Sequence, residues 1–290
     1  MAYEKEINLF LNKMKISKED FEKSGVEWKT LKAIKKAFKD NEKQYEKIAF
    51  TYVEELSGFE NVHTVRYRIK DVDHLLEKII RKTLEGENDI TVDNYAEKIT
   101  DIIGVRVLYV FKSDWKRLHE EIKKRYADKF SQNPEIKLKD GDSEELYKGI
   151  KNVEIKKGIY RSIHYTLRHT SYDENSGSEI CKVKVEIQTR SIFEEGWSEI
   201  NHKLIYKKEL SVDIRDKMME ISNILCVLSG ECDQLGELLR TYKIEESSQE
   251  RDDLKKKSIS ATEMVDIMEG CLDIPVQRKK EKQSNKRETQ

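Results

Sequence analysis

The spacing of hydrophobic residues changes abruptly between residues 181 and 206. Up to Thr189 every second residue is apolar, which is the pattern of a strand with one buried face. Beyond Thr189 the apolar residues recur every three or four positions, which predicts an amphipathic helix capped by Thr189 or Ser191. The stretch is therefore predicted to be a strand that runs directly into a helix. The apolar residues are Val183, Val185 and Ile187 in the strand, and Phe193, Trp197, Ile200 and Leu204 in the helix.

Three earlier segments also have strand patterns. Residues 62–71 alternate, and the polar positions of that strand carry several cations on one face. Residues 102–111 form an almost continuous apolar run, which is typical of a strand buried on both faces. Residues 155–169 alternate again, after a turn predicted at Gly158. The cations on the face of the first strand are Arg66, Arg68 and Lys70.

Helical spacing dominates the first sixty residues, which we interpret as a helical layer over a sheet. Ser17 and Asp20 match a capping box within this region. Asp71 can cap a further helix directly after the first strand. Another helix is predicted from a cap at Ser113 to about Tyr126.

The remaining segments are a loop, a long helix and a polar tail. Residues 128–152 have no clear period and are predicted to form a long loop of the kind that covers a site. After Ser211 a four-three spacing over about four heptads predicts a long helix that packs on the domain or on a partner helix. The tail beyond Tyr242 is polar and is expected to be partly disordered. The stripe of the long helix comprises Ile214, Met218, Ile221, Leu225, Leu228, Cys232, Leu235 and Leu239.

Composition limits the classes of function. Charged residues make up 38% of the chain, but 55 Lys and Arg against 56 Asp and Glu leave a net charge of only -1. The chain therefore has no overall basic field for nucleic acid, and any basic site must be local. No run approaches the roughly 18 apolar residues of a membrane span, and the four cysteines form no C-x-x-C pair. We expect a cytoplasmic protein with free thiols and no membrane contact.

Two acids and a cluster of cations are the candidate chemistry. Lys78 follows the basic strand and can point back toward its end, so a phosphate site and a solvated basic face both remain open. Asp101 immediately precedes the buried strand, where it could bind a metal, cap the strand or pair with Arg106. Glu186 lies on a polar strand face, where a carboxylate can bind a metal or take a proton. Taken alone, both acids fit a structural role better than a catalytic one.

Taken in chain order, these segments resemble the synthetase domain of the RelA/SpoT alarmone enzymes, especially the short single-domain members. The resemblance covers about residues 62–206. It rests on Y-R-I-K followed by Lys78, D-I-I-G-V-R-V, Y-R-S-I-H, V-E-I-Q-T-R and W-S-E-I-N-H-K-L-I-Y-K.

The resemblance implies an α+β (α/β) fold, with a nucleotidyltransferase-like mixed β-sheet flanked by helices. The expected divisions are an N-terminal helical layer at 1–60, the synthetase core at 61–210, a long C-terminal helix for packing or oligomerisation at 211–242, and a polar tail at 243–290.

The resemblance also implies an activity, namely transfer of pyrophosphate from ATP to the ribose 3'-hydroxyl of GDP or GTP with Mg²⁺ as cofactor. Such an enzyme is a GTP diphosphokinase. The family's catalytic and metal-binding positions match Glu186 and Asp101. Its ATP-binding positions match Arg68, Lys70 and Lys78, with Arg66 and Arg106 as neighbours. Its acceptor-binding positions match Tyr160, His164, Lys156 and Gln188.

Some residues depart from the family's pattern. Gly158 and Ile159 stand where the family commonly has an Asn-Gly pair, and His74 stands where a serine is frequent. These departures leave the acceptor open between guanosine nucleotides, adenosine nucleotides and the 3' end of tRNA, which some toxin-type relatives modify. A catalytically silent nucleotide-binding or interaction module is the remaining alternative. The heptad stripe predicts a homo-oligomer if it does not pack inward.

Overall fold

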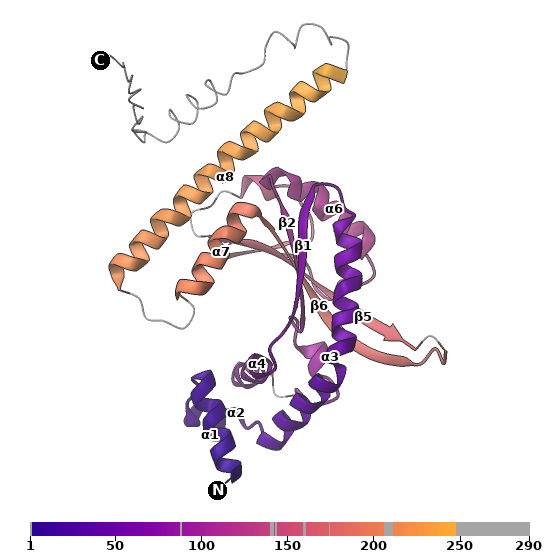
Figure 1. Cartoon of the computed structure of the whole chain (residues 1–290), viewed down its shortest axis with the longest axis vertical. Coiled ribbons are helices and arrows are strands. Elements are labelled where there is room, and N and C mark those ends of the chain that lie inside the picture. The colour runs from indigo at the N-terminus through magenta and orange to yellow at the C-terminus, as the bar shows by residue number, and fades with distance from the viewer. Residues whose placement is uncertain are drawn as a thin grey trace, which may run out of the picture. The chain divides into compact units, whose positions relative to one another are not determined.

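Six strands pair into one sheet, in the order β1-β2-β6-β5-β3-β4 (Figure 1). β2 pairs antiparallel with β1 and parallel with β6, and β5 pairs antiparallel with β6. The mixed sheet predicted from the sequence is thus confirmed. The strands are β1 (Val62–Ile69), β2 (Ile103–Tyr109), β3 (Glu135–Lys139), β4 (Glu154–Gly158), β5 (Ser162–Tyr172) and β6 (Glu179–Ser191).

The computed structural model describes residues 2–87, 89–139, 142, 144–158, 161–173, 175–205 and 211–247. The chain divides into a unit of residues 1–234 and a second unit that begins at Leu235. The helices are α1 (Ala2–Met14), α2 (Lys18–Ser24), α3 (Trp28–Ser57), α4 (Val72–Leu84), α5 (Tyr95–Lys98), α6 (Trp115–Arg125), α7 (Ile192–Ile205) and α8 (Val212–Ser247). Short 3-10 turns occur at Lys112–Asp114 and Glu145–Tyr147.

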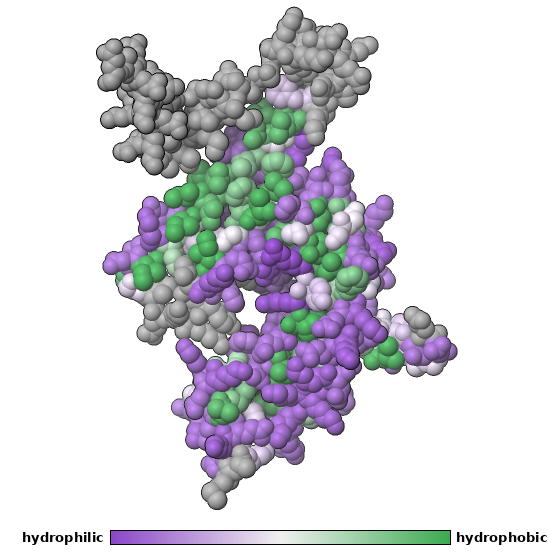
Figure 2. Space-filling model, in the orientation of Figure 1, coloured by the Kyte–Doolittle hydropathy of each residue, from purple (hydrophilic) through white to green (hydrophobic). Residues whose placement is uncertain are grey.

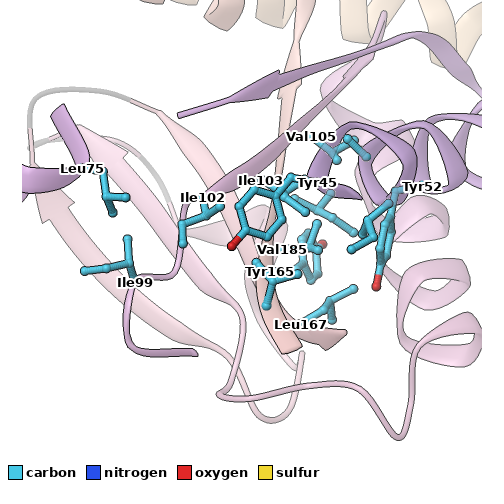
Figure 3. Close-up of a cluster of buried hydrophobic side chains, with 14 of the residues drawn as sticks. Tyr45, Tyr52, Leu75, Ile99, Ile102, Ile103, Val105, Tyr165, Leu167 and Val185 are labelled. Atoms are coloured by element: carbon cyan, nitrogen blue, oxygen red, sulfur yellow. The ribbon is translucent and has the colours of Figure 1, made fainter. Parts of the chain in front are cut away.

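The core forms where the apolar sheet face meets α3 and α6. Val105 on β2, Val185 on β6 and Leu167 on β5 are buried there, and Figure 3 shows them beside Tyr52 of α3. Successive strand residues point to opposite faces, so the intervening polar residues of these strands lie on the other face. The hydrophobic effect that buries one face therefore also determines which side chains line the site.

Two predicted helix caps are confirmed. Ser17 accepts a hydrogen bond from the backbone N–H of Asp20 at 2.9 Å and begins α2. Asp71 accepts from the backbone N–H groups of Asp73 and His74 at 2.9 and 3.1 Å and begins α4. Because β1 ends only two residues before Asp71, this cap ties the start of α4 to the end of the basic strand.

Three local predictions were wrong. α6 begins at Trp115 after the 3-10 turn, so its N-cap position is Asp114 in place of Ser113, and the Asp114 side chain makes no cap hydrogen bond to α6. The segment predicted as one loop contains β3, whose Ile136 and Leu138 are buried. Five residues are too few for periodicity to stand out among charged neighbours. Gly158 ends strand β4 and does not form a turn, because backbone pairing with β3 extends to it.

The inner side of α8 packs against the rest of the first unit. Met218 is buried, and Asp233 accepts a hydrogen bond from the backbone N–H of Ser113. The opposite side of the helix exposes Ile224 and Val227, and Figure 2 shows a largely hydrophobic surface along α8. The predicted stripe is therefore at least partly an intramolecular contact, and self-association stays a prediction.

The described residues contain no helix long and apolar enough to cross a membrane. Cys181, Cys226 and Cys232 are free thiols. Cys271 lies outside the described residues, as does the part of the tail beyond residue 247.

A buried polar cluster joins α6 to the sheet. The Tyr165 hydroxyl accepts from Trp115 Nε1 at 2.9 Å and lies 3.1 Å from His119 Nδ1. All three side chains are fully buried. Burial and the nearby Lys123 cation lower the pKa of His119 to about 4. The folded protein therefore holds this imidazole in its neutral form.

We predict that His119 makes the fold acid-sensitive. The unfolded chain binds a proton at this histidine near pH 6.5, while the folded chain does so only near pH 4, so stability is lost as pH falls through that window. Between pH 7 and pH 4.5 the wild type should lose about 2 kcal/mol more than a His119→Gln variant. Urea unfolding at both pH values measures the difference. Substitution of the exposed His63 by Gln is the control, and an equal pH response in wild type and His119→Gln would contradict the prediction.

Candidate active site

One row of polar residues crosses four adjacent strands, from the edge strand β1 to β5. Arg106 on β2 pairs with Arg66 on β1 and with Gln188 on β6. Gln188 in turn pairs with His164 on β5. Residues opposite one another on paired strands project to the same face. The register therefore brings together four predicted site residues from four separate segments.

The adjacent row contains a glycine between two predicted site residues. Gly104 pairs with Arg68 on β1 and with Glu186 on β6. A Cβ atom at Gly104 would lie 3.4 Å from Cγ and Nε of Arg68. The glycine of the D-I-I-G-V-R-V segment thus leaves the strand surface open for the Arg68 side chain to lie across it.

Asp101 is held between two lysines just before β2. Lys70 and Lys78 donate to its two carboxylate oxygens at 2.8 and 2.9 Å. All three side chains are mostly buried. Burial acts to raise the pKa of Asp101, but the two ammonium groups outweigh it and lower the pKa to about 2. Asp101 is therefore ionised, and its structural partners are the same lysines that the sequence assigned to ATP.

Glu186 is fixed by hydrogen bonds to both of its oxygens. His164 Nδ1 lies 3.0 Å from one oxygen, and Gln188 Nε2 donates to the other at 2.6 Å. Burial and the charge of Asp101 act to raise the pKa of Glu186, but the hydrogen bonds outweigh them and leave it lowered. Because an ionised carboxylate only accepts, Nδ1 of His164 carries the proton in this contact.

A cleft of about 280 Å³ opens between the sheet and α7. Its walls carry three arginines and are completed by residues of α7. Arg66 and Arg68 have no acid partner among the described residues, whereas Arg106 pairs with Glu195 and Glu199. The lining residues are Arg66, Tyr67, Arg68, Gly104, Val105, Arg106, Gln188, Ser198, Glu199 and His202.

The predicted acceptor residues are only partly brought together. His164 lies beside Glu186, as described above. Lys156 is farther along the sheet on β4, where its ammonium group donates to Glu135 at 2.9 Å. Tyr160 and Ile159 lie outside the described residues. Of the predicted acceptor residues, the structure therefore places His164 and Gln188 beside Glu186 and places Lys156 apart from them.

Asp101 and Glu186 have the chemistry that Mg²⁺ requires. Magnesium sites commonly combine one or two carboxylates with water and substrate phosphates. The charge of Asp101 acts on the pKa of Glu186, so the two carboxylates share one region of the site. Within the described residues no cluster of three or more potential metal-ligating side chains occurs. A two-carboxylate site completed by phosphates fits these residues, whereas a closed protein cage does not.

Sequence reasoning missed the buried pair of Arg190 and Glu195. Arg190 Nη1 donates to Glu195 at 3.0 Å, and Arg190 also donates to Ser162 on β5 and Ser198 on α7. Arg190 continues the polar series of the alternating strand, so the sequence pattern does not mark it as buried. Glu199 and His202 of α7 also line the cleft.

Comparisons with known proteins find similar chains. GTP pyrophosphokinase YwaC of Bacillus subtilis (strain 168) is 25% identical over 177 residues, which are 58% of this chain and 71% of that protein.

Two solved structures resemble the fold. A GTP pyrophosphokinase family protein from Streptococcus pneumoniae aligns with a TM-score of 0.52 and 20% identity, over 73% of this chain and 98% of that one. The small alarmone synthetase 1 from Bacillus subtilis aligns with a TM-score of 0.50 and 21% identity, over 68% and 94%.

The sequence pattern described as "Region found in RelA / SpoT proteins" matches residues 67–211, which are half of the chain. This match contains Lys70, Lys78, Asp101 and Glu186, the residues whose carboxylates and ammonium groups form the centre of the site. The chain belongs to the RelA/SpoT family.

Proposed function

We propose that this protein is a (p)ppGpp synthetase, which transfers pyrophosphate from ATP to the ribose 3'-hydroxyl of GDP or GTP. The single observation that carries the proposal is the group formed by Asp101 with its two lysines and by Glu186, whose pKa is influenced by the charge of Asp101. Two carboxylates beside several cations suit a reaction that moves a charged diphosphate group. The relative YwaC carries the name of this activity.

The donor side supplies positive charge for the ATP phosphates. Arg66 and Arg68 line the cleft without acid partners among the described residues, so they can bind phosphate oxygens directly. Lys70 and Lys78 now pair with Asp101. If Asp101 held a metal cation instead, both ammonium groups would be free to bind phosphate oxygens. In this proposal the lysines neutralise the acid before the nucleotide binds and the phosphates afterwards.

Glu186 is the proposed base. The 3'-oxygen of the acceptor attacks the β-phosphorus of ATP, the bond from that phosphorus to the bridging oxygen breaks, and AMP leaves. The hydroxyl proton passes to a carboxylate oxygen of Glu186, whose lowered pKa keeps it ionised and able to orient the hydroxyl. His164 and Gln188 hold that carboxylate in one orientation.

Asp101 and Glu186 are the residues that would hold Mg²⁺. When bound, the ion would neutralise charge on the ATP phosphates and so favour attack by the acceptor oxygen. The proposal places this reaction in the cytoplasm, where ATP and GTP are abundant. It requires no membrane, and it leaves homo-oligomerisation and contact with tRNA to experiment.

We predict that the purified protein converts GDP or GTP to the 3'-pyrophosphorylated nucleotide when ATP and Mg²⁺ are supplied. Glu186→Gln should reduce kcat about 100-fold or more, because the amide cannot accept the hydroxyl proton. Chromatography of labelled products measures the conversion by the wild type and the loss of turnover in Glu186→Gln. Parallel reactions contain ADP, ATP alone or tRNA as the acceptor.

Glu60→Gln provides the control, since Glu60 pairs with Arg117 on the surface. Label on tRNA or on adenosine nucleotides, but not on GDP or GTP, would show that the acceptor is one of those molecules. The proposed transfer of pyrophosphate from ATP would then still hold. No transfer to any acceptor, with intact folding, would contradict the proposal and favour a silent nucleotide-binding module.

We further predict that Asp101→Asn separates binding from turnover. Loss of the carboxylate frees the two lysine cations, so the variant should bind metal-free ATP at least as tightly as wild type while product formation with Mg²⁺ falls about 100-fold. Calorimetric titration in a chelator and the product assay give the two values. Asp89→Asn removes the exposed pair with Lys98 and serves as the control. Unchanged turnover in Asp101→Asn would remove this residue from the mechanism.

A further inference from the structure

Arg106 reaches into the cleft and is bound there by two acids of α7. Its Nη1 atom donates to Glu195 at 2.5 Å and to Glu199 at 2.8 Å. Nη1 carries two hydrogens, so these contacts use both of them. A nucleotide that needs this part of the guanidinium must therefore displace one of the acids.

The two acids differ in how easily they can be displaced. The Glu195 side chain is only 8% exposed, and its second oxygen accepts from Arg190 Nη1 at 3.0 Å. Arg190 is also buried, so displacement of Glu195 would take an acid partner from a buried charge. Glu195 is therefore a fixed anchor that joins the two arginines.

Glu199 has none of these restraints. Its side chain is 49% exposed, and Arg106 is its only hydrogen-bond partner among the described residues. A half-exposed pair of this kind contributes little stability and can exchange with another anion. It also borders the cleft, so its carboxylate lies where a nucleotide would approach.

We propose that Glu199 is a positioning residue that occupies Arg106 until the donor nucleotide takes its place, and so sets the affinity for the donor. Glu195 keeps Arg106 at the cleft during the exchange, and only the contact with Glu199 breaks. The proposal rests on the proposed function for the identity of the nucleotide. The released guanidinium can meet phosphate oxygens with its N–H groups or a base with its planar face.

The proposal predicts a specific coupling between the two residues. Glu199→Gln should bind the donor about threefold tighter than wild type, the effect expected from loss of one half-exposed ion pair. Arg106→Met should weaken donor binding. In the Arg106→Met background, Glu199→Gln should bring no further gain, because there is no longer an arginine to release.

The experiment measures binding of an ATP analogue with a methylene group between the α- and β-phosphates, which cannot transfer its diphosphate. Calorimetric titration of wild type, both single variants and the double variant gives the double-mutant cycle, and thermal unfolding confirms that each variant is folded. Glu60→Gln is the matched control, because Glu60 forms an exposed pair with Arg117 at the same 2.8 Å distance.

The outcomes separate this inference from the proposed function. If the wild type does not bind the analogue and makes no product, the proposed function fails. If the wild type binds it but Glu199→Gln binds more weakly, Glu199 itself contacts the ligand and the inference is overturned. If Glu199→Gln still binds the analogue more tightly in the Arg106→Met background, the inference is also overturned. Loss of the negative charge at Glu199 would then explain the tighter binding without any release of Arg106. The KM for ATP should fall in Glu199→Gln while the KM for the acceptor stays unchanged.

Discussion

The structure of the site depends on keeping two carboxylates ionised while both are largely buried, Glu186 on β6 and Asp101 just before β2. Burial acts to raise the pKa of both Asp101 and Glu186, and their mutual repulsion adds to it at Glu186. Different groups oppose that effect: two ammonium groups at Asp101, and an imidazole with an amide at Glu186. The acid next to the lysines therefore suits a metal and phosphates, whereas the acid next to His164 suits a hydroxyl group.

These contacts exist because of the sheet's register. The parallel pair β2 and β6 places Gly104 beside Glu186, and the antiparallel pair β1 and β2 places Arg68 on the other side of the same glycine. A slip of one residue in either pair would turn the polar rows into the core and the apolar rows into the cleft. The apolar residues that pack on α3 therefore help to maintain the site on the opposite face of the sheet.

Much of the fold, and the position of Arg66 and Arg68 on one strand face, could be predicted from the sequence, because the signals there are local. The alternation around Glu186 and the cap at Asp71 each depend on residues close together in the chain. Strand β3 was missed because it is short and charged. The contacts of Glu195 were missed because they join α7 to two strands, and no local pattern specifies which arginine a distant acid will reach.

Four of the six predicted site cations have an acid partner within the described part of the chain, whereas Arg66 and Arg68 have none. Lys70 and Lys78 share Asp101, Arg106 has Glu195 and Glu199, and Lys156 has Glu135. Such pairing limits the repulsion among clustered cations in the ligand-free protein. It also means that a polyphosphate would bind the four paired cations by exchange with their acids, and would bind Arg66 and Arg68 directly. The net gain from each exchanged contact would be smaller than its charge alone suggests. The acid partners therefore determine, as much as the cations do, how tightly the site holds its substrates.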